Sequence, residues 1–134
     1  MTNKDITIII TTFRSEDKID MCLNSIDREI KVIVVENSNN EAFKNYLQNK
    51  YQNVECELTN DNLGYGKANN VGLKKVKTKY SLILNPDTTL NKDTIINFLI
   101  FICVLQFFLT PTPHGNVLLA QNFCSPNQSM NHHN

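Results

Sequence analysis

The sequence YSLILNPD at residues 80–87 decides the fold of this chain. A short apolar run that is bounded by turn-forming residues is typical of a buried β-strand. Pro86 cannot donate a hydrogen bond to a neighbouring strand and favours an extended conformation at Asn85, so the strand should end there. In open α/β sheets, ligands bind beyond the carboxyl ends of the strands. We therefore expect Asn85 and Asp87 to lie at a ligand-binding edge.

The chemistry of these two side chains suits a metal ion. Asp87 offers a hard carboxylate oxygen and Asn85 a neutral amide oxygen beside it, a pair suited to Mg²⁺ or Mn²⁺ that a diphosphate already holds. The alternative is a strand followed by an ordinary turn that an Asn or Asp side chain stabilises. The other segments of the chain are needed to choose between a metal-binding pair and an ordinary turn.

Three more strands are predicted upstream of residue 80. Residues 5–12 (DITIIITT) and 30–35 (IKVIVV) are rich in β-branched residues, as expected of strands that are covered on both faces. Residues 54–58 alternate between apolar and polar side chains, as in an edge strand. We expect residues 5–12 to form the central strand, adjacent to the strands at 30–35 and 80–84.

Helices are predicted between these strands. Ser15 can cap a first helix with an apolar face, and residues 41–51 and 67–75 carry two more. A last helix is expected to begin near Thr94, and residues 115–134 show no sustained periodicity. Because strands alternate with helices, the predicted fold class is α/β, with a mostly parallel sheet, flanking helices and right-handed crossovers.

The strand ends place four polar segments on one edge of this sheet. They are Thr12-Phe13, Glu36-Asn37, the loop at 60–66 and Asn85-Pro86-Asp87. A dinucleotide-binding domain would need its glycine-rich turn directly after the first strand. Residues 11–15 contain no glycine, and the glycines follow the third strand instead. An NAD-binding domain is therefore disfavoured.

The charges are balanced overall but unevenly placed. The 13 basic and 13 acidic residues cancel, so no global field favours nucleic acid or an anionic membrane. All of them fall within residues 1–93, which leaves residues 94–134 without one. We accordingly divide the chain into a first part at 1–98, which carries all the charges, and an apolar, uncharged tail at 99–134.

The cysteines and the amino terminus indicate the compartment. Four cysteines lie far apart with no CxxC pair, and no signal sequence begins the chain. We expect them to be reduced and mostly buried in a cytoplasmic protein. The three histidines all lie in the tail, where metal binding is not expected.

Four blocks of this sequence resemble a known family. TIIITTFRSEDKIDMCLNSI (7–26), KVIVVENSNN (31–40), NDNLGYGKANNVGLKKV (60–76) and YSLILNPDTTL (80–90) are similar to successive blocks of family 2 glycosyltransferases, near the rhamnosyltransferase-like branch. The resemblance covers roughly residues 4–98. Its most specific feature is NxGxGxxNNxG followed by NPD.

The resemblance implies the nucleotide-binding half of a GT-A fold, which is Rossmann-like and here incomplete. It implies a nucleotide-diphosphate sugar of the UDP or dTDP type and a divalent metal, Mg²⁺ or Mn²⁺, bound by Asp87. The residues that it assigns to the nucleotide sugar are Thr12 and Phe13 at the nucleoside, Glu36 at the base or ribose, Asn62, Gly64, Lys67 and Asn70 at the base and phosphate wall, and Asn85 beside the metal.

Three of these residues have simpler explanations that stay open at this point. Lys67 can be a solvated helix residue, Phe13 can belong to the core, and Glu36 can cap the turn that follows its strand. Glu36 also departs from the Asp that the family usually has there, which leaves the base preference open.

The resemblance also implies an enzyme that transfers a sugar to the hydroxyl of a saccharide or lipid-linked acceptor, in the synthesis of cell-surface polysaccharides or glycoconjugates. In this family, the acceptor site and the catalytic base lie after the NPD block. No Asp or Glu follows Asp93 here, although a general base must reach the proton that it removes. We therefore expect a truncated or frame-shifted form, and the alternative is a natural short form with a membrane-seeking helix. For the function, the alternative to a glycosyltransferase is a non-catalytic remnant or nucleotide-binding module.

The segment at 95–109 is apolar almost throughout. A helix of about 15 residues spans only ~22 Å, against ~30 Å for the hydrocarbon core of a membrane. We expect self-association, or peripheral contact with the inner face of a membrane, rather than a membrane-spanning helix.

Overall fold

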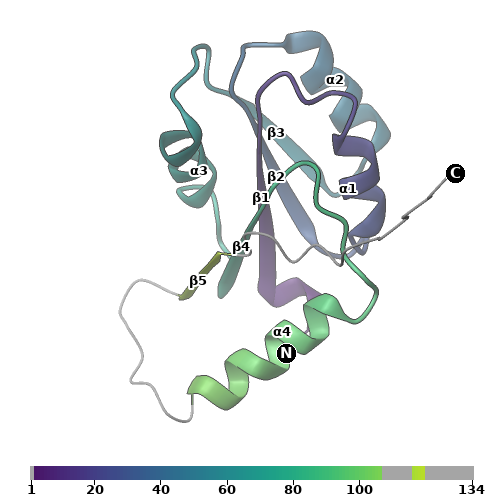
Figure 1. Ribbon diagram of the computed structural model, residues 1–134, viewed down its shortest axis with the longest axis vertical. Coiled ribbons are helices and arrows are strands. Elements are labelled where there is room, and N and C mark those ends of the chain that lie inside the picture. Colours follow the sequence, from purple (N-terminus) through teal and green to yellow (C-terminus); the bar gives the residue numbers. More distant parts are fainter. Residues whose placement is uncertain (1, 107–115, 120–134) are drawn as a thin grey trace, which may run out of the picture.

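The computed structural model describes residues 2–106 and 116–119, which form a five-stranded parallel sheet with helices on both faces (Figure 1). The sheet order is β3-β2-β1-β4-β5. The strands are β1 (Ile6–Thr12), β2 (Lys31–Glu36), β3 (Val54–Leu58), β4 (Tyr80–Leu84) and β5 (Asn116–Leu119). The helices are a 3-10 turn η1 (Asn3–Asp5), α1 (Ile19–Ser25), α2 (Glu41–Lys50), α3 (Tyr65–Leu73) and α4 (Thr94–Gln106).

This architecture confirms the predicted α/β fold. β1 lies between β2 and β4 and is parallel to both, and β3 lies at an edge of the sheet. All seven residues of β1 are buried, as expected of a strand covered on both faces. The register aligns Thr12 with Glu36 and Ile10 with Leu84, so that the carboxyl ends of the three strands meet at one edge.

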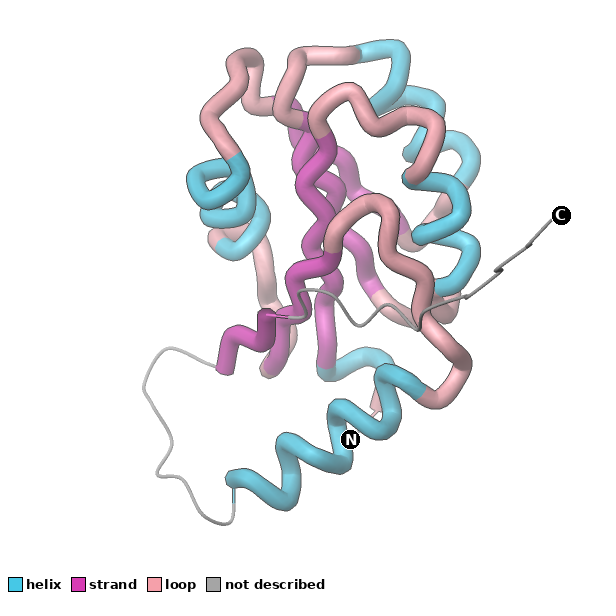
Figure 2. The backbone as a smooth tube through the Cα atoms, viewed as in Figure 1, coloured by secondary structure: helices cyan, strands magenta, loops and turns pink. Residues whose placement is uncertain are grey.

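Two apolar layers cover the sheet (Figure 2). The larger layer holds α1, α2 and α4 against residues such as Ile8 and Ile10, whereas the smaller one holds α3 against residues such as Ile9 and Ile33. α1 and α2 lie on one side of the sheet and α3 lies on the other (Figure 1). Successive residues of β1 thus point to opposite layers, because side chains alternate along a strand.

α1 begins later than the sequence predicted. Ser15 was expected to cap it, but the first helical residue is Ile19 and the preceding Lys18 makes no capping hydrogen bond. The Ser15 hydroxyl donates to the carbonyl of Phe13 (3.1 Å), while its own carbonyl accepts from the amide of Lys18 (3.1 Å). The backbone at Arg14 is left-handed (φ 52°), and residues 15–18 form a turn before the helix.

The sequence also predicted no regular structure beyond residue 115, which is wrong for four residues. β5 pairs in parallel with β4, from Tyr80 opposite Asn116 to Ile83 opposite Leu119. A four-residue strand is too short for its pattern to be recognised, and an open sheet edge supplies the partner that specifies it. The remaining tail lies outside the described residues, as do the three histidines and Cys124.

Cys22 and Cys56 are free and buried, as predicted. The pKa of both thiols is raised to about 12, mainly because they are buried and also because a carboxylate lies nearby, Asp87 for Cys22 and Glu36 for Cys56. Both thiols therefore stay protonated at neutral pH and act as small core residues.

The outer face of α4 is apolar and exposed. Ile95, Leu99 and Ile102 pack into the core, whereas Ile100 and Phe101 are 56% and 58% exposed. In the parts of the chain that the structure describes, no helix is long and apolar enough to cross a membrane. Self-association or peripheral membrane contact through residues 95–109 stays a prediction, and residues 107–109 lie outside the described range.

If this face mediates self-association, charges placed on it should abolish the contact. The double variant Ile100→Lys with Phe101→Glu is expected to sediment as a smaller species than the parent chain at the same concentration. The matched control is Met21→Lys, which changes a single exposed apolar residue on α1 and should leave sedimentation unchanged. Equal sedimentation of all three proteins as monomers would contradict self-association.

Close packing of α3 on the sheet depends on Gly72. A Cβ atom at this position would lie 2.7 Å from Cγ2 of Ile9 and 3.1 Å from Cγ2 of Val35. Such contacts are too short, so a larger residue would push α3 away from β1 and β2.

We therefore predict that Gly72→Val lowers the free energy of unfolding by about 2 kcal/mol. Gly66→Ala is the control, because a Cβ there meets nothing within 4 Å and alanine favours the helix. Urea denaturation of both variants is the measurement. An unchanged midpoint for Gly72→Val would show that α3 is not packed as described.

Candidate functional site

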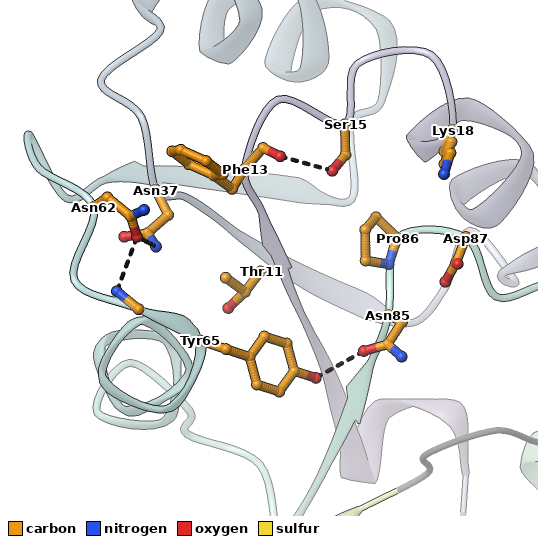
Figure 3. Close-up of a pocket in the computed structure, with 11 residues that line it drawn as sticks. Thr11, Phe13, Ser15, Lys18, Asn37, Asn62, Tyr65, Asn85, Pro86 and Asp87 are labelled. Atoms are coloured by element: carbon orange, nitrogen blue, oxygen red, sulfur yellow. Dashed lines mark hydrogen bonds between the residues drawn. The ribbon is translucent and has the colours of Figure 1, made fainter.

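A pocket of about 500 Å³ opens at the carboxyl ends of β1, β2 and β4, at the edge that the sequence predicted (Figure 3). Five of the predicted site residues line it: Phe13, Asn62, Gly64, Asn85 and Asp87. The sequence did not assign the six others, which are Thr11, Ser15, Lys18, Asn37, Tyr65 and Pro86.

Phe13 is 42% exposed, so it does not belong to the core. The guanidinium of Arg14 lies 5.3 Å from the centre of its ring. Figure 3 shows Phe13 at the same end of the pocket as Asn37 and Asn62. An aromatic face beside amide groups is a surface on which a nucleobase can stack and form hydrogen bonds.

Four predicted residues lie outside the pocket lining. Lys67 and Asn70 are exposed on α3, whereas Thr12 and Glu36 are fully buried at the ends of β1 and β2. The Glu36 carboxylate accepts hydrogen bonds from the Thr12 hydroxyl (2.6 Å), the Ser38 amide (2.9 Å) and the Ser38 hydroxyl. Glu36 therefore caps the turn after β2, as the simpler explanation held.

A direct contact between Glu36 and a base or ribose, which the resemblance implies, would require the carboxylate to leave these partners. In its observed position, the Glu36 side chain instead joins the end of β1 at Thr12 to the turn after β2 at Ser38. The roles inferred for Thr12, Glu36, Lys67 and Asn70 toward a nucleotide stay predictions.

Asn37 joins the loops around the pocket. Its side-chain Nδ2 donates to Oδ1 of Asn62 (2.9 Å), and its Oδ1 accepts from the amide of Leu63 (3.0 Å) and the hydroxyl of Thr59 (2.9 Å). Its backbone amide donates to the carbonyl of Thr12 (2.8 Å). Through its side chain and its backbone amide, Asn37 thus connects the ends of β1, β2 and β3 to the loop before α3. Its position directly after a buried strand, which Asn85 shares, could have identified it from the sequence.

Tyr65 closes the opposite side of the pocket. α3 begins two residues before the predicted Lys67, which places Tyr65 in its first turn, and the Tyr65 hydroxyl donates to Oδ1 of Asn85 (2.9 Å) (Figure 3). Thr11 also lines the pocket, and its hydroxyl donates to Oδ1 of Asn69 (2.7 Å). The Asn85 side chain is thereby oriented, and its amide oxygen keeps a lone pair for a further partner.

Asp87 differs from these amides because its carboxylate has no partner. Among the described residues, it accepts no hydrogen bond and makes no salt bridge. The turn that carries it is in contact with α1, where the Cys22 sulfur lies 3.8 Å from the carbonyl oxygen of Asn85. A fixed but unpaired carboxylate at a pocket edge is suited to a cation.

The donor set fits a hard divalent metal that is held mainly by its substrate. No group of three or more His, Cys, Asp or Glu side chains within the described residues could hold a metal by itself. Asp87 supplies one carboxylate and Asn85 one amide oxygen, which are ligands that Mg²⁺ and Mn²⁺ accept. The remaining ligands would have to be phosphate oxygens and water, as is usual for Mg²⁺.

The family model described as glycosyl transferase family 2 matches residues 7–106, which include β1 to α4 and every residue of the pocket lining. The chain belongs to this family. The resemblance found in the four sequence blocks is thereby confirmed, and the incomplete coverage of relatives agrees with a match to their amino-terminal half.

Two curated relatives are glycan-synthesis enzymes by name. The chain is 27% identical over 95 residues to the low-salt glycan biosynthesis hexosyltransferase Agl10 of Haloferax volcanii, an alignment that covers 68% of this chain and 30% of the relative. It is 30% identical over 106 residues to the poly(ribitol-phosphate) beta-N-acetylglucosaminyltransferase TarS of Staphylococcus aureus, covering 72% of this chain and 18% of the relative.

The solved structures agree with this assignment. Residues 1–349 of S. aureus TarS superpose with a TM-score of 0.65 at 27% identity, over 75% of this chain and 32% of that one. This family member thus shares the fold described above. The chain spans less than a third of the length of the relatives and structures named here.

The hydrogen bonds of the Asn37 side chain can be tested by removing them in two steps. Asn37→Asp keeps the acceptor for Leu63 but loses the donor to Asn62, whereas Asn37→Ala loses both. We expect the free energy of unfolding to fall by about 1 kcal/mol for the first variant and about 2 kcal/mol for the second, because Asn37 is buried.

Hydrogen exchange at the amide of Leu63 supplies the local measurement. It should accelerate most in Asn37→Ala, because that amide loses its acceptor. Asn49→Ala, on the exposed surface of α2, is the control and should change neither quantity. Unchanged exchange at Leu63 in Asn37→Ala would contradict the hydrogen bond from the Leu63 amide to the Asn37 side chain.

Proposed function

We propose that this chain binds a nucleoside diphosphate sugar together with Mg²⁺ or Mn²⁺, as the donor-binding half of a glycosyltransferase. The observation that carries the proposal is the pocket itself. It combines an aromatic and amide end at Phe13, Asn37 and Asn62 with an unpaired carboxylate, Asp87, at the other end. A nucleoside suits the first end, and a metal-bound diphosphate suits the second.

Each group of this chain has a separate task in the proposal. Phe13 stacks on the base, and the oriented amides of Asn37 and Asn62 provide the polar contacts. Asp87 holds the cation, and Asn85 lies beside it with its orientation set by Tyr65. A cation held there would supply positive charge to offset the negative charge that develops on the departing diphosphate.

The wider role follows from the family. The sugar is transferred to the hydroxyl of a saccharide or lipid-linked acceptor in the synthesis of surface polysaccharides or glycoconjugates. One relative is named a hexosyltransferase and the other an N-acetylglucosaminyltransferase. These names support a hexose or related sugar as the transferred group. UDP and dTDP are the nucleotides to test.

Turnover by these 134 residues is proposed to be slow or absent. Transfer requires a base that deprotonates the acceptor hydroxyl, and residues 94–134 contain neither Asp nor Glu. This composition favours a second candidate function for these residues, a nucleotide-binding module that holds the donor without transferring the sugar.

The test is calorimetric titration with UDP and dTDP, with and without Mn²⁺. Binding should depend on Mn²⁺, and Asp87→Ala should weaken it by at least about tenfold, which is the loss of one charge-assisted contact. Asp61→Ala is the matched control, because Asp61 is exposed on a neighbouring loop and does not line the pocket. Metal-dependent binding that survives Asp87→Ala would remove the role given to Asp87.

A donor-hydrolysis and sugar-transfer assay on the same proteins separates the two functions. Binding without turnover supports the nucleotide-binding module. Rapid transfer by the 134-residue chain would contradict the claim that it lacks a base.

A further inference from the structure

The pocket carries its charges at one end. Of the residues that line it, Lys18 and Asp87 are the two with ionised side chains. Figure 3 shows both on the side of the pocket that lies away from Phe13, Asn37 and Asn62. The chain has no net charge, so any attraction for an anion must come from such a local arrangement.

These two charges do not neutralise each other. Within the described residues, the Lys18 ammonium has no hydrogen-bonded or ion-paired partner, and the same holds for the Asp87 carboxylate. Opposite charges that line one end of a pocket without pairing leave room between them for a ligand that carries both signs. A diphosphate with a divalent cation is such a ligand.

The position of Lys18 follows from the packing of α1. Lys18 immediately precedes the helix, and Cys22 lies four residues later, which is on the same helix face. The Cys22 sulfur contacts the carbonyl of Asn85 (3.8 Å), in the turn that also carries Asp87. The neighbouring Ile19 is fully buried and anchors the start of the helix. The face of α1 that begins at Lys18 is therefore held against the Asn85–Asp87 turn.

We propose that Lys18 binds the phosphate oxygens of the nucleotide, opposite the cation held by Asp87. The proposal rests on the proposed function and adds a residue that neither the sequence motifs nor the resemblance assigned. It also moves the expected positive charge at the phosphates from Lys67 to Lys18. Lys67 lies on the exposed surface of α3, outside the pocket lining. An ammonium is a compact charge that suits a phosphate without demanding a fixed geometry.

The test compares ligands that differ in their number of phosphates. Lys18→Gln should weaken the binding of UDP with Mn²⁺ by about tenfold, weaken that of UMP less, and leave uridine unchanged. Lys18→Arg keeps the charge and should retain most of the affinity. The loss should shrink as the salt concentration rises, because salt screens exposed charges.

Two further lysine variants complete the design. Lys77→Gln removes an exposed lysine at the turn between α3 and β4, outside the pocket lining, and should bind UDP as the parent does. Lys67→Gln tests the lysine that the resemblance implies. Thermal unfolding of each variant, matched to the parent, shows that the fold is intact.

The outcomes distinguish this inference from the proposed function. If the parent chain binds neither UDP nor dTDP, both are overturned. If the parent binds UDP with Mn²⁺ but Lys18→Gln binds it equally well, or loses uridine to the same extent, the assignment of Lys18 alone is overturned. A selective loss of UDP in Lys67→Gln, with none in Lys18→Gln, would return the role to Lys67.

Discussion

The burial of β1 on both faces is the constraint on which the rest of the structure depends. Seven consecutive buried residues can satisfy their backbone groups only through neighbouring strands, and β2 and β4 supply the hydrogen bonds on either side. The register of these two strand pairs brings the carboxyl ends of all three strands to the same edge of the sheet. The loops that follow them, with Phe13, Asn37 and Asp87, therefore meet in a single pocket.

The site separates two kinds of polar group. The amides and hydroxyls around it satisfy one another, as in the contacts of Asn37 with Asn62 and of Tyr65 with Asn85. The described residues leave no buried side-chain polar atom without a partner. Satisfied groups hold the loops in place because breaking such bonds in a buried position is costly. Lys18 and Asp87 stand outside this network, which leaves their charges available to a ligand.

Membership of glycosyl transferase family 2 agrees with this arrangement, and so does the superposition on part of TarS. The portion that the family model matches, residues 7–106, contains the strands from β1 to β4, except for Ile6, and the loops at their carboxyl ends. α4 ends that portion and differs in character from the other helices, because it is apolar on its exposed face as well as its buried one. A helix of this composition favours further cover over contact with water.

The sequence by itself determined the central position of β1 beside β2 and β4 and the edge of the sheet that carries the site. Continuous β-branched runs at residues 6–12 and 32–35 require cover on both faces, and Pro86 marks the end of β4 whatever the surroundings. These are local properties, and they also placed Phe13, Asn62, Gly64, Asn85 and Asp87 correctly at the pocket.

Tertiary structure decided which polar side chains face the pocket and which face one another. Thr12 and Glu36 end their strands and Phe13 and Asn37 follow directly, yet the parallel register sets Thr12 opposite Glu36 and buries them as a pair. Lys18 lines the pocket from its position directly before α1, a helix that contacts the Asn85 turn through Cys22. Such outcomes depend on contacts between segments far apart in the chain, and no local pattern of residues specifies them.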